Sequence, residues 1–134
     1  MQSKWIIGVG LIAAALLALP AWPHHSHGNY EDTFMDIEGV ATEVHLLVPH
    51  SWLYLQVKDP KGGEPQVWAL EATGRTQLQK IGVTAETVKP GDTVKARCHH
   101  LRDGSNGCLL GFLKDKEGTV KDWDGNGAPA PTDF

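Results

Sequence analysis

The sequence predicts a small all-β domain, a five-stranded barrel with one short helix between its third and fourth strands. Over most of residues 36–123, apolar side chains alternate with polar ones at every second position, which is the period of a half-buried strand. Glycine, proline and aspartate separate these stretches, as turns between strands require. Residues 73–81 depart from the period of two, because their apolar side chains fall three apart.

Five alternating stretches are the expected strands. In chain order they are residues 40–48, 52–57, 66–72, 93–99 and 108–114, with a short further strand over 119–123. Leu78 and Ile81 mark the helix, and Gly82 follows where a helix C-terminus favours glycine. Three strands, a helix and two strands is the element order of the OB-like barrel, in which the helix plugs one end. A two-sheet sandwich is the alternative for five short strands.

The N-terminus has the composition of a secretory signal peptide. Lys4 makes its start positive, residues 5–19 are almost entirely apolar, and Pro20 and Ala21 follow. We therefore expect cleavage after Ala21 and a periplasmic or secreted mature protein. The alternative is an uncleaved membrane anchor, since residues 5–22 approach the ~20 apolar residues that span a bilayer.

Composition divides the chain into a signal peptide and three further parts. The signal peptide covers residues 1–21, a histidine-rich N-terminal arm 22–35, the barrel 36–123, and a Gly/Pro-rich tail 124–134 that we expect to be disordered. Signal removal takes away one lysine and no acidic residue, so the net charge changes from −4 to −5. An acidic protein without a basic run is poorly suited to nucleic acid, and we expect no nucleic-acid partner.

The two cysteines, Cys98 and Cys108, are predicted to form a disulfide. Each shares the apolar face of its strand, and the two lie symmetrically about Asp103 in the loop between them. An oxidising compartment favours the pairing. The alternative is a Cys/His metal site that includes His99 and His100, but strand alternation makes His99 point away from Cys98.

Histidine is the residue type that points to a function. All seven histidines lie outside the signal peptide, and three of them are in the arm. Imidazole is a common protein ligand for copper and zinc, and three or four imidazoles complete a coordination sphere. We expect a transition-metal site, copper before zinc, in which the arm reaches histidines of the barrel. Its candidate ligands are His24, His25, His27, His50 and His99.

Several short motifs resemble those of a family of small exported bacterial proteins of unknown function. They are His24-His25-Ser26, Pro49-His50-Ser51-Trp52, Lys89-Pro90-Gly91-Asp92, and His99 followed by Leu101-Arg102-Asp103-Gly104. The resemblance extends from His24 to about Gly111. The chain departs from the family pattern at Val48, Cys98 and His100, where that pattern has Asn, Gly and Pro. The resemblance implies export and this architecture, and it implies no activity.

Two other classes of function stay open. A metal-free barrel would bind a partner protein or a small apolar ligand through Trp52, Tyr54 and Trp68. A copper enzyme with an N-terminal histidine would need processing to His24, whereas the expected cleavage leaves Trp22-Pro23 in front of it. The sequence has no recognisable Ser/His/Asp arrangement or pair of catalytic carboxylates, so we expect no enzymatic activity.

The signal peptide gives a first testable prediction. Intact-mass measurement of the protein recovered from the periplasm should show loss of residues 1–21, or cleavage within about two residues of that position, because small residues precede signal cleavage sites. Recovery of the full-length chain from the membrane fraction would contradict this expectation. It would show a domain tethered to the outer face of the membrane instead.

Overall fold

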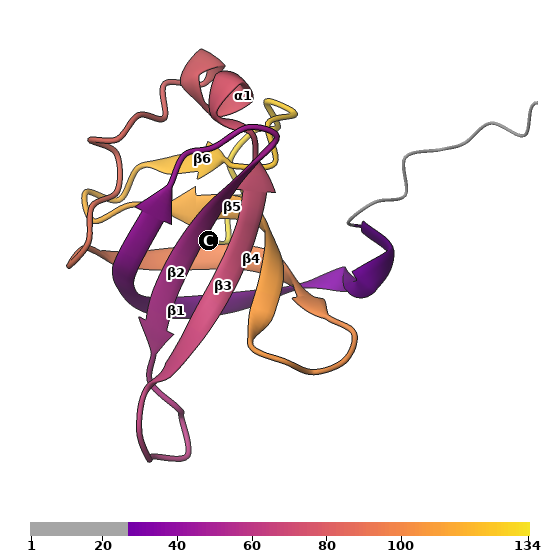
Figure 1. Ribbon diagram of the computed structural model, residues 1–134, viewed down its shortest axis with the longest axis vertical. Helices are drawn as coiled ribbons and strands as arrows, with labels where there is room; N and C mark the ends of the chain where they lie inside the picture. Colours follow the sequence, from indigo (N-terminus) through magenta and orange to yellow (C-terminus); the bar gives the residue numbers. More distant parts are fainter. Residues whose placement is uncertain (1–26) are drawn as a thin grey trace, which may run out of the picture.

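A computed structural model of the chain describes residues 27–134 (Figure 1). The expected signal peptide and the candidate ligands His24 and His25 lie outside the described residues. The elements in chain order are the 3-10 helix η1 (His27–Asn29), β1 (Tyr30–His45), β2 (His50–Val57), β3 (Gln66–Thr73), α1 (Arg75–Lys80), β4 (Thr93–Leu101), β5 (Gly107–Lys114) and β6 (Val120–Asp122). None of the helices in this described part is long and apolar enough to cross a membrane.

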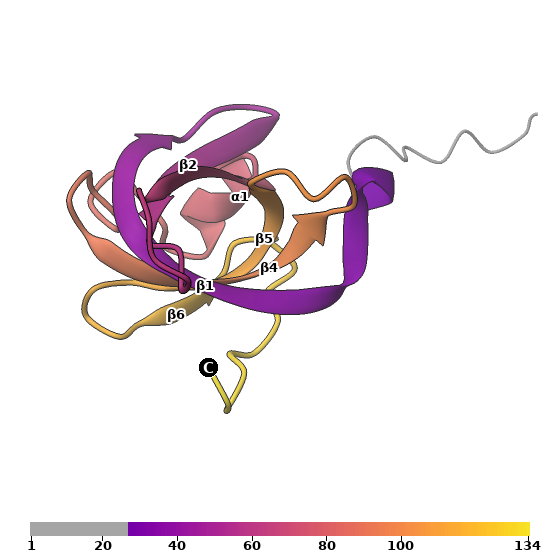
Figure 2. The same ribbon diagram turned by 90° about the horizontal axis from the view of Figure 1, so that it is seen from below.

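The strands close into a barrel. Antiparallel pairing gives the order β3-β2-β1-β4-β5-β6, and a parallel pairing between β3 and β5 joins the ends of the five-stranded ring. Figure 2 looks along the barrel, with α1 behind the ring of strands. This confirms the predicted OB-like barrel with one short helix between the third and fourth strands, and closure excludes the sandwich.

The core forms as the alternation predicts. Every second residue of the central strands points inward, and the helix and the loop after it cover one end of the barrel. The inward-facing set is exposed by 2 % or less and includes Leu53, Leu55, Leu70, Ala72, Val94, Ala96, Cys98, Cys108, Leu110, Leu78, Val83 and Val88.

The first strand begins ten residues earlier than the sequence pattern indicates. Residues 30–35, expected in the arm, belong to β1, and Phe34 pairs with His99 of β4. The first half of β1 pairs with β4 and its second half, from Val40, pairs with β2. Because the first half has a strand on only one side, most of its side chains are exposed. The alternation that marks a half-buried strand is therefore weak there.

The C-terminal segment also differs from the expected disordered tail. Asp133 accepts a hydrogen bond from Nη1 of Arg97 at 2.7 Å. The Phe134 ring lies about 5 Å from the cationic groups of Arg97, Lys95 and Lys114. Cation–π contacts and an ion pair thus hold residues 124–134 against β4 and β5, although the segment has little to bury.

The Cys98–Cys108 disulfide is present inside the barrel, with a Cα–Cα distance of 5.7 Å. The two cysteines are diagonal neighbours and not direct partners, because Cys98 pairs with Leu110 and Cys108 with His100. This pairing centres the β4–β5 hairpin on Gly104, which has a φ of 81°, a conformation that favours glycine. The predicted disulfide is therefore confirmed in a register shifted by one residue.

Replacement of both cysteines by alanine should lower the free energy of unfolding by about 2–3 kcal/mol, because the disulfide restricts the unfolded chain. Denaturant unfolding without reductant measures the difference. A reductant should bring the wild type close to the variant and leave the variant unchanged. Two thiols that react with an alkylating agent in the denatured, unreduced exported protein would contradict the disulfide.

Candidate functional site

A buried carboxylate, Glu71, lies on the outer face of the barrel. Its neighbours Leu70 and Ala72 point into the core, so Glu71 points outward, yet it is 6 % exposed. Its direct register partners are Trp52 of β2 on one side and Leu109 of β5 on the other. A carboxylate withdrawn from water costs free energy unless hydrogen bonds satisfy both of its oxygens.

Two side chains satisfy the two oxygens of Glu71. The Tyr30 hydroxyl donates to Oε2 at 2.6 Å, and Nδ1 of His50 forms a short hydrogen bond to Oε1. Tyr30 is the first residue of β1 and His50 is the first residue of β2. The network therefore joins the beginnings of two strands to the C-terminal half of a third.

Glu71 sets the orientation of the His50 ring. An ionised carboxylate can only accept hydrogen bonds, so the proton of the neutral ring lies on Nδ1 and the lone pair on Nε2. The His50 side chain is 42 % exposed, whereas that of Glu71 is 9 % exposed. A carboxylate that holds one ring nitrogen while the other is free is the usual setting of a metal-ligating histidine.

The Pro49-His50-Ser51-Trp52 motif positions this ring by strand alternation. Ser51 points inward, is 1 % exposed, and accepts a hydrogen bond from the backbone N–H of Leu47 at 3.2 Å. Trp52, on the outward side like His50, lies directly opposite Glu71. The loop before β2 is also held by Arg75, whose N–H donates to the Leu47 carbonyl at 2.8 Å.

Gly74 explains how closely the helix approaches this loop. A Cβ atom at Gly74 would lie 2.5 Å from the carbonyl oxygen of Pro49, so only glycine fits between β3 and α1 here. The residue that precedes His50 is thereby packed against the start of the helix. His50 therefore projects from a fixed backbone.

The Tyr30 phenol is a stable donor. Burial, the hydrogen bond to Glu71 and the negative charge of Glu71 all raise the pKa of Tyr30 well above its ordinary value. The phenol keeps its proton through the neutral range and continues to donate to the carboxylate.

The described chain begins next to this network. Helix η1 directly precedes Tyr30, and the Asn29 carbonyl accepts a hydrogen bond from the Arg102 N–H at 2.8 Å. His27 lies in η1. His24 is six residues before Tyr30, and six residues of extended chain span about 20 Å. The described chain therefore begins at the strand whose first residue, Tyr30, contacts the same carboxylate as His50.

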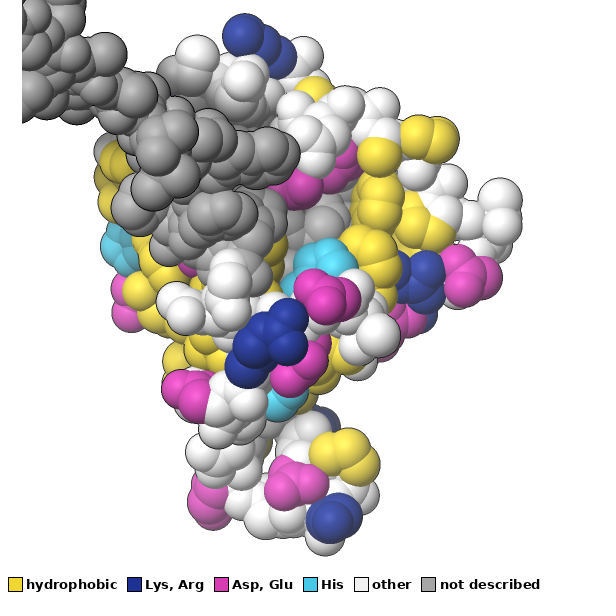
Figure 3. Space-filling model, turned by 90° about the vertical axis from the view of Figure 1, so that its right-hand side faces the viewer, with side chains coloured by type: hydrophobic (Ala, Val, Ile, Leu, Met, Phe, Trp, Pro, Cys, Tyr) yellow, Lys and Arg dark blue, Asp and Glu magenta, His cyan; other side chains and the backbone are white. Residues whose placement is uncertain are grey.

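The charge near this attachment point is mixed. Arg102 lies 3.3 Å from carboxylate oxygens of both Glu31 and Asp32. On the face shown in Figure 3, histidine side chains are exposed among acidic and apolar ones, and the Lys and Arg side chains are scattered.

His99 lies apart from His50. It pairs with Leu109, which in turn pairs with Glu71, so His99 is two strands from Glu71, or roughly 10 Å of backbone. The Phe34 ring packs against the His99 ring with a centroid distance of 4.1 Å. Nδ1 of His99 is buried without a hydrogen-bond partner among the described residues.

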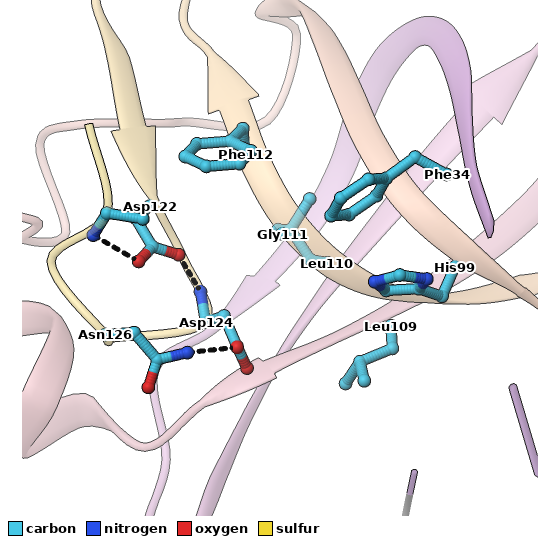
Figure 4. A pocket seen from close by; sticks show the side chains of 10 residues that line it. Phe34, His99, Leu109, Leu110, Gly111, Phe112, Asp122, Asp124 and Asn126 are labelled. Carbon is cyan, nitrogen blue, oxygen red and sulfur yellow. Dashed lines mark hydrogen bonds between the residues drawn. The ribbon is translucent and has the colours of Figure 1, made fainter. Parts of the chain in front are cut away.

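The pocket beside His99 has a volume of about 310 Å³ (Figure 4). The Phe34 and His99 rings lie side by side on one flank, and the loop of Asp122, Asp124 and Asn126 lies on the other. Both oxygens of Asp122 accept backbone N–H groups, from Asp124 at 3.0 Å and from Ala128 at 2.9 Å. No group of three His, Cys, Asp or Glu side chains within residues 27–134 is arranged to hold a metal ion.

The aromatic candidates for partner binding divide between the two faces of the barrel wall. Trp52 and Tyr54 alternate with the buried Ser51 and Leu53 and therefore face outward, whereas Trp68 packs against the core. These three side chains do not form one surface.

Sequence reasoning missed Glu71 and Tyr30. The signal for Glu71 was a single acidic residue within the strongly apolar stretch of residues 67–72, on a strand with a buried outer face. Tyr30 carried no comparable signal, because it lies 41 positions from its partner. Only the register of the closed barrel brings the two together.

Comparison with known proteins gives one family and a similarity of fold. A family model described as a family of unknown function (DUF6152) matches residues 12–110. Comparison with curated proteins gives no match. Among solved structures, the mitochondrial single-stranded DNA-binding protein Rim1 of S. cerevisiae is similar, with 12 % identity, a TM-score of 0.48, and coverage of 62 % of this chain and 92 % of that one. The similarity to Rim1 carries no inference about function.

Tyr30→Phe should lower the free energy of unfolding by about 1–2 kcal/mol near neutral pH, because the buried carboxylate loses a donor. The raised pKa of Tyr30 means that the folded protein keeps the phenol proton after the unfolded chain has lost it. The stabilisation is therefore complete below about pH 10, the ordinary tyrosine value, and declines above it.

Urea unfolding at pH 8 and at about pH 10.5 tests this dependence. The difference between wild type and Tyr30→Phe should narrow at the higher pH. Tyr54→Phe is the matched control, since Tyr54 contacts the His45 ring on the outer face of β2 and not Glu71. A difference that is equal at both pH values would contradict the role assigned to the phenol.

Proposed function

The chain belongs to this family of unknown function (DUF6152), and from its own residues we propose that it is an exported protein that binds a transition metal. Copper is preferred to zinc, and the ligands are His50 of the barrel and the histidines of the N-terminal arm. The observation that carries the proposal is the hydrogen bond from His50 Nδ1 to the buried Glu71, which leaves Nε2 without a hydrogen-bond partner among residues 27–134 in a side chain that is 42 % exposed.

The two members of the Glu71–His50 pair differ in burial. A carboxylate is seldom fully buried unless it is paired. Here the carboxylate is buried and the ring is half-exposed. Burying a carboxylate beside a ring that remains accessible costs free energy, and it is the arrangement that raises the basicity of a ligating nitrogen.

One imidazole does not hold a metal by itself, so the arm is needed. His24, His25 and His27 precede Tyr30, whose hydroxyl contacts the same carboxylate that holds His50. Together with Nε2 of His50 they supply up to four imidazoles, enough for a copper or zinc site. His99 would join this set only after its ring leaves Phe34, so its contribution is tested separately.

Export is part of the proposal. The signal-like N-terminus predicts a periplasmic or secreted protein, and the disulfide is compatible with such a compartment. We propose no enzymatic activity and no nucleic-acid partner. The Ser51 hydroxyl, the one beside His50, is buried and bonded to Leu47, so it is not available as a nucleophile.

Copper(II) titration of the mature, tag-free protein tests the proposal. His50→Ala and the triple substitution of His24, His25 and His27 by alanine should each weaken binding at least about tenfold. Glu71→Gln should weaken it about 10- to 100-fold, the usual effect of losing a carboxylate behind a ligating histidine. Zinc should bind less tightly than copper, and copper affinity should fall on acidification, because protonated imidazole cannot ligate.

His45→Ala is the matched control. His45 is a half-exposed histidine of β1 that contacts the exposed carboxylate of Glu43, and its loss should leave copper affinity unchanged. An effect of the arm substitution alone would show a chelating tail and would refute the barrel site. An effect of no substitution would refute metal binding. Unchanged affinity in His99→Ala would place His99 outside the set of ligands.

A further inference from the structure

The end of the barrel opposite α1 opens into a cavity of about 530 Å³. Figure 2 looks into this end, past the hairpin that joins β2 to β3. Inward-facing side chains that belong to the core or pack against it form its apolar wall, namely Met35, Ile37, Val57 and Trp68. The volume and the mostly apolar wall are typical of small-molecule sites.

Trp68 offers this cavity a fixed aromatic surface. The His100 ring packs against the indole with a centroid distance of 5.1 Å and an angle of 32°. Nε2 of His100 is hydrogen-bonded to the Ser105 carbonyl at 2.9 Å, which holds the imidazole in place. Trp68 lines the cavity and His100 does not, so the indole is supported from behind and accessible from the cavity. Such a surface stacks against flat rings.

Carboxylates outnumber cations among the side chains that line the cavity. Its charged side chains are Asp36, Glu38, Asp59 and Lys58. Arg97 neutralises Asp36 through hydrogen bonds of 2.7 and 2.9 Å, and Lys95 lies 3.8 Å from the same carboxylate and opposite Glu38 in the β1–β4 register. Neither Arg97 nor Lys95 lines the cavity, so the remaining charged side chains of the lining are Glu38, Asp59 and Lys58. The chain as a whole also has a negative net charge, −4. Anionic ligands are therefore disfavoured, and a cation over an indole face gains further attraction.

We propose that this cavity binds a small planar aromatic molecule without negative charge, stacked on Trp68, and that a positively charged amine on the molecule strengthens binding. The site is separate from the proposed copper site. Trp68 faces the inside of the barrel, whereas Glu71, three residues later in β3, faces outward.

Three probes with the same ring and different charge test the proposal by calorimetric titration of the mature protein. Indole is neutral, tryptamine is a cation and indole-3-acetate is an anion. Tryptamine should bind most tightly and indole-3-acetate at least about tenfold more weakly. Trp68→Leu keeps an apolar side chain but removes the ring, and it should weaken tryptamine binding at least tenfold. Tyr54→Leu, on the outer face of β2, should leave the binding unchanged.

Glu38→Lys provides a second variant that does not touch the core, because Glu38 is an exposed rim residue. This substitution should weaken tryptamine binding and reduce the preference for tryptamine over indole-3-acetate. Equal affinity for the three probes, absence of binding, or full affinity in Trp68→Leu would each overturn the proposal. Copper affinity should be unchanged in Glu38→Lys, so failure of this site is distinguishable from failure of the copper site.

Discussion

Ala69, Leu70 and Glu71 of β3 pair in parallel with Gly107, Cys108 and Leu109 of β5, and this short ladder closes the barrel. Closure puts Leu70 and Cys108 side by side in the core, where Cys108 is also bonded to Cys98 of the next strand. The same ladder flanks Glu71 with a strand on each side, which keeps its outward-pointing carboxylate from water. An open sheet with the same strands would leave this carboxylate solvated, without the need for Tyr30 or His50.

Strand alternation along β3 also places two functional side chains on opposite faces of the same strand. Trp68 contributes an aromatic surface to the interior, and Glu71 contributes a buried charge to the outer face. Each is supported by a histidine, His100 behind the indole and His50 beside the carboxylate. The roles of the two rings differ. The His100 ring is packed and bonded to a carbonyl, whereas Nε2 of His50 has no hydrogen-bond partner in the described part of the chain.

The sequence was sufficient for features that depend on local periodicity. The alternation, the helix near Leu78 and the cysteines of one hairpin predicted the barrel, its plug and its disulfide. Features that depend on long-range register were not predictable, since Tyr30 meets Glu71 41 positions away and Arg97 meets Asp133 36 positions away. The start of β1 was missed for a related reason: a strand paired on one side leaves most of its side chains exposed.

Coordination of a metal by both the arm and His50 would have a thermodynamic consequence for the whole chain. A metal that joined the arm to His50 would close a loop of about 26 residues, and closing a loop restricts the unfolded chain. It would act as a removable cross-link, made of coordination bonds, between the N-terminal segment and β2. The folded population would then rise with the free metal concentration around the protein. The stability of the fold would thus report how much metal its surroundings contain.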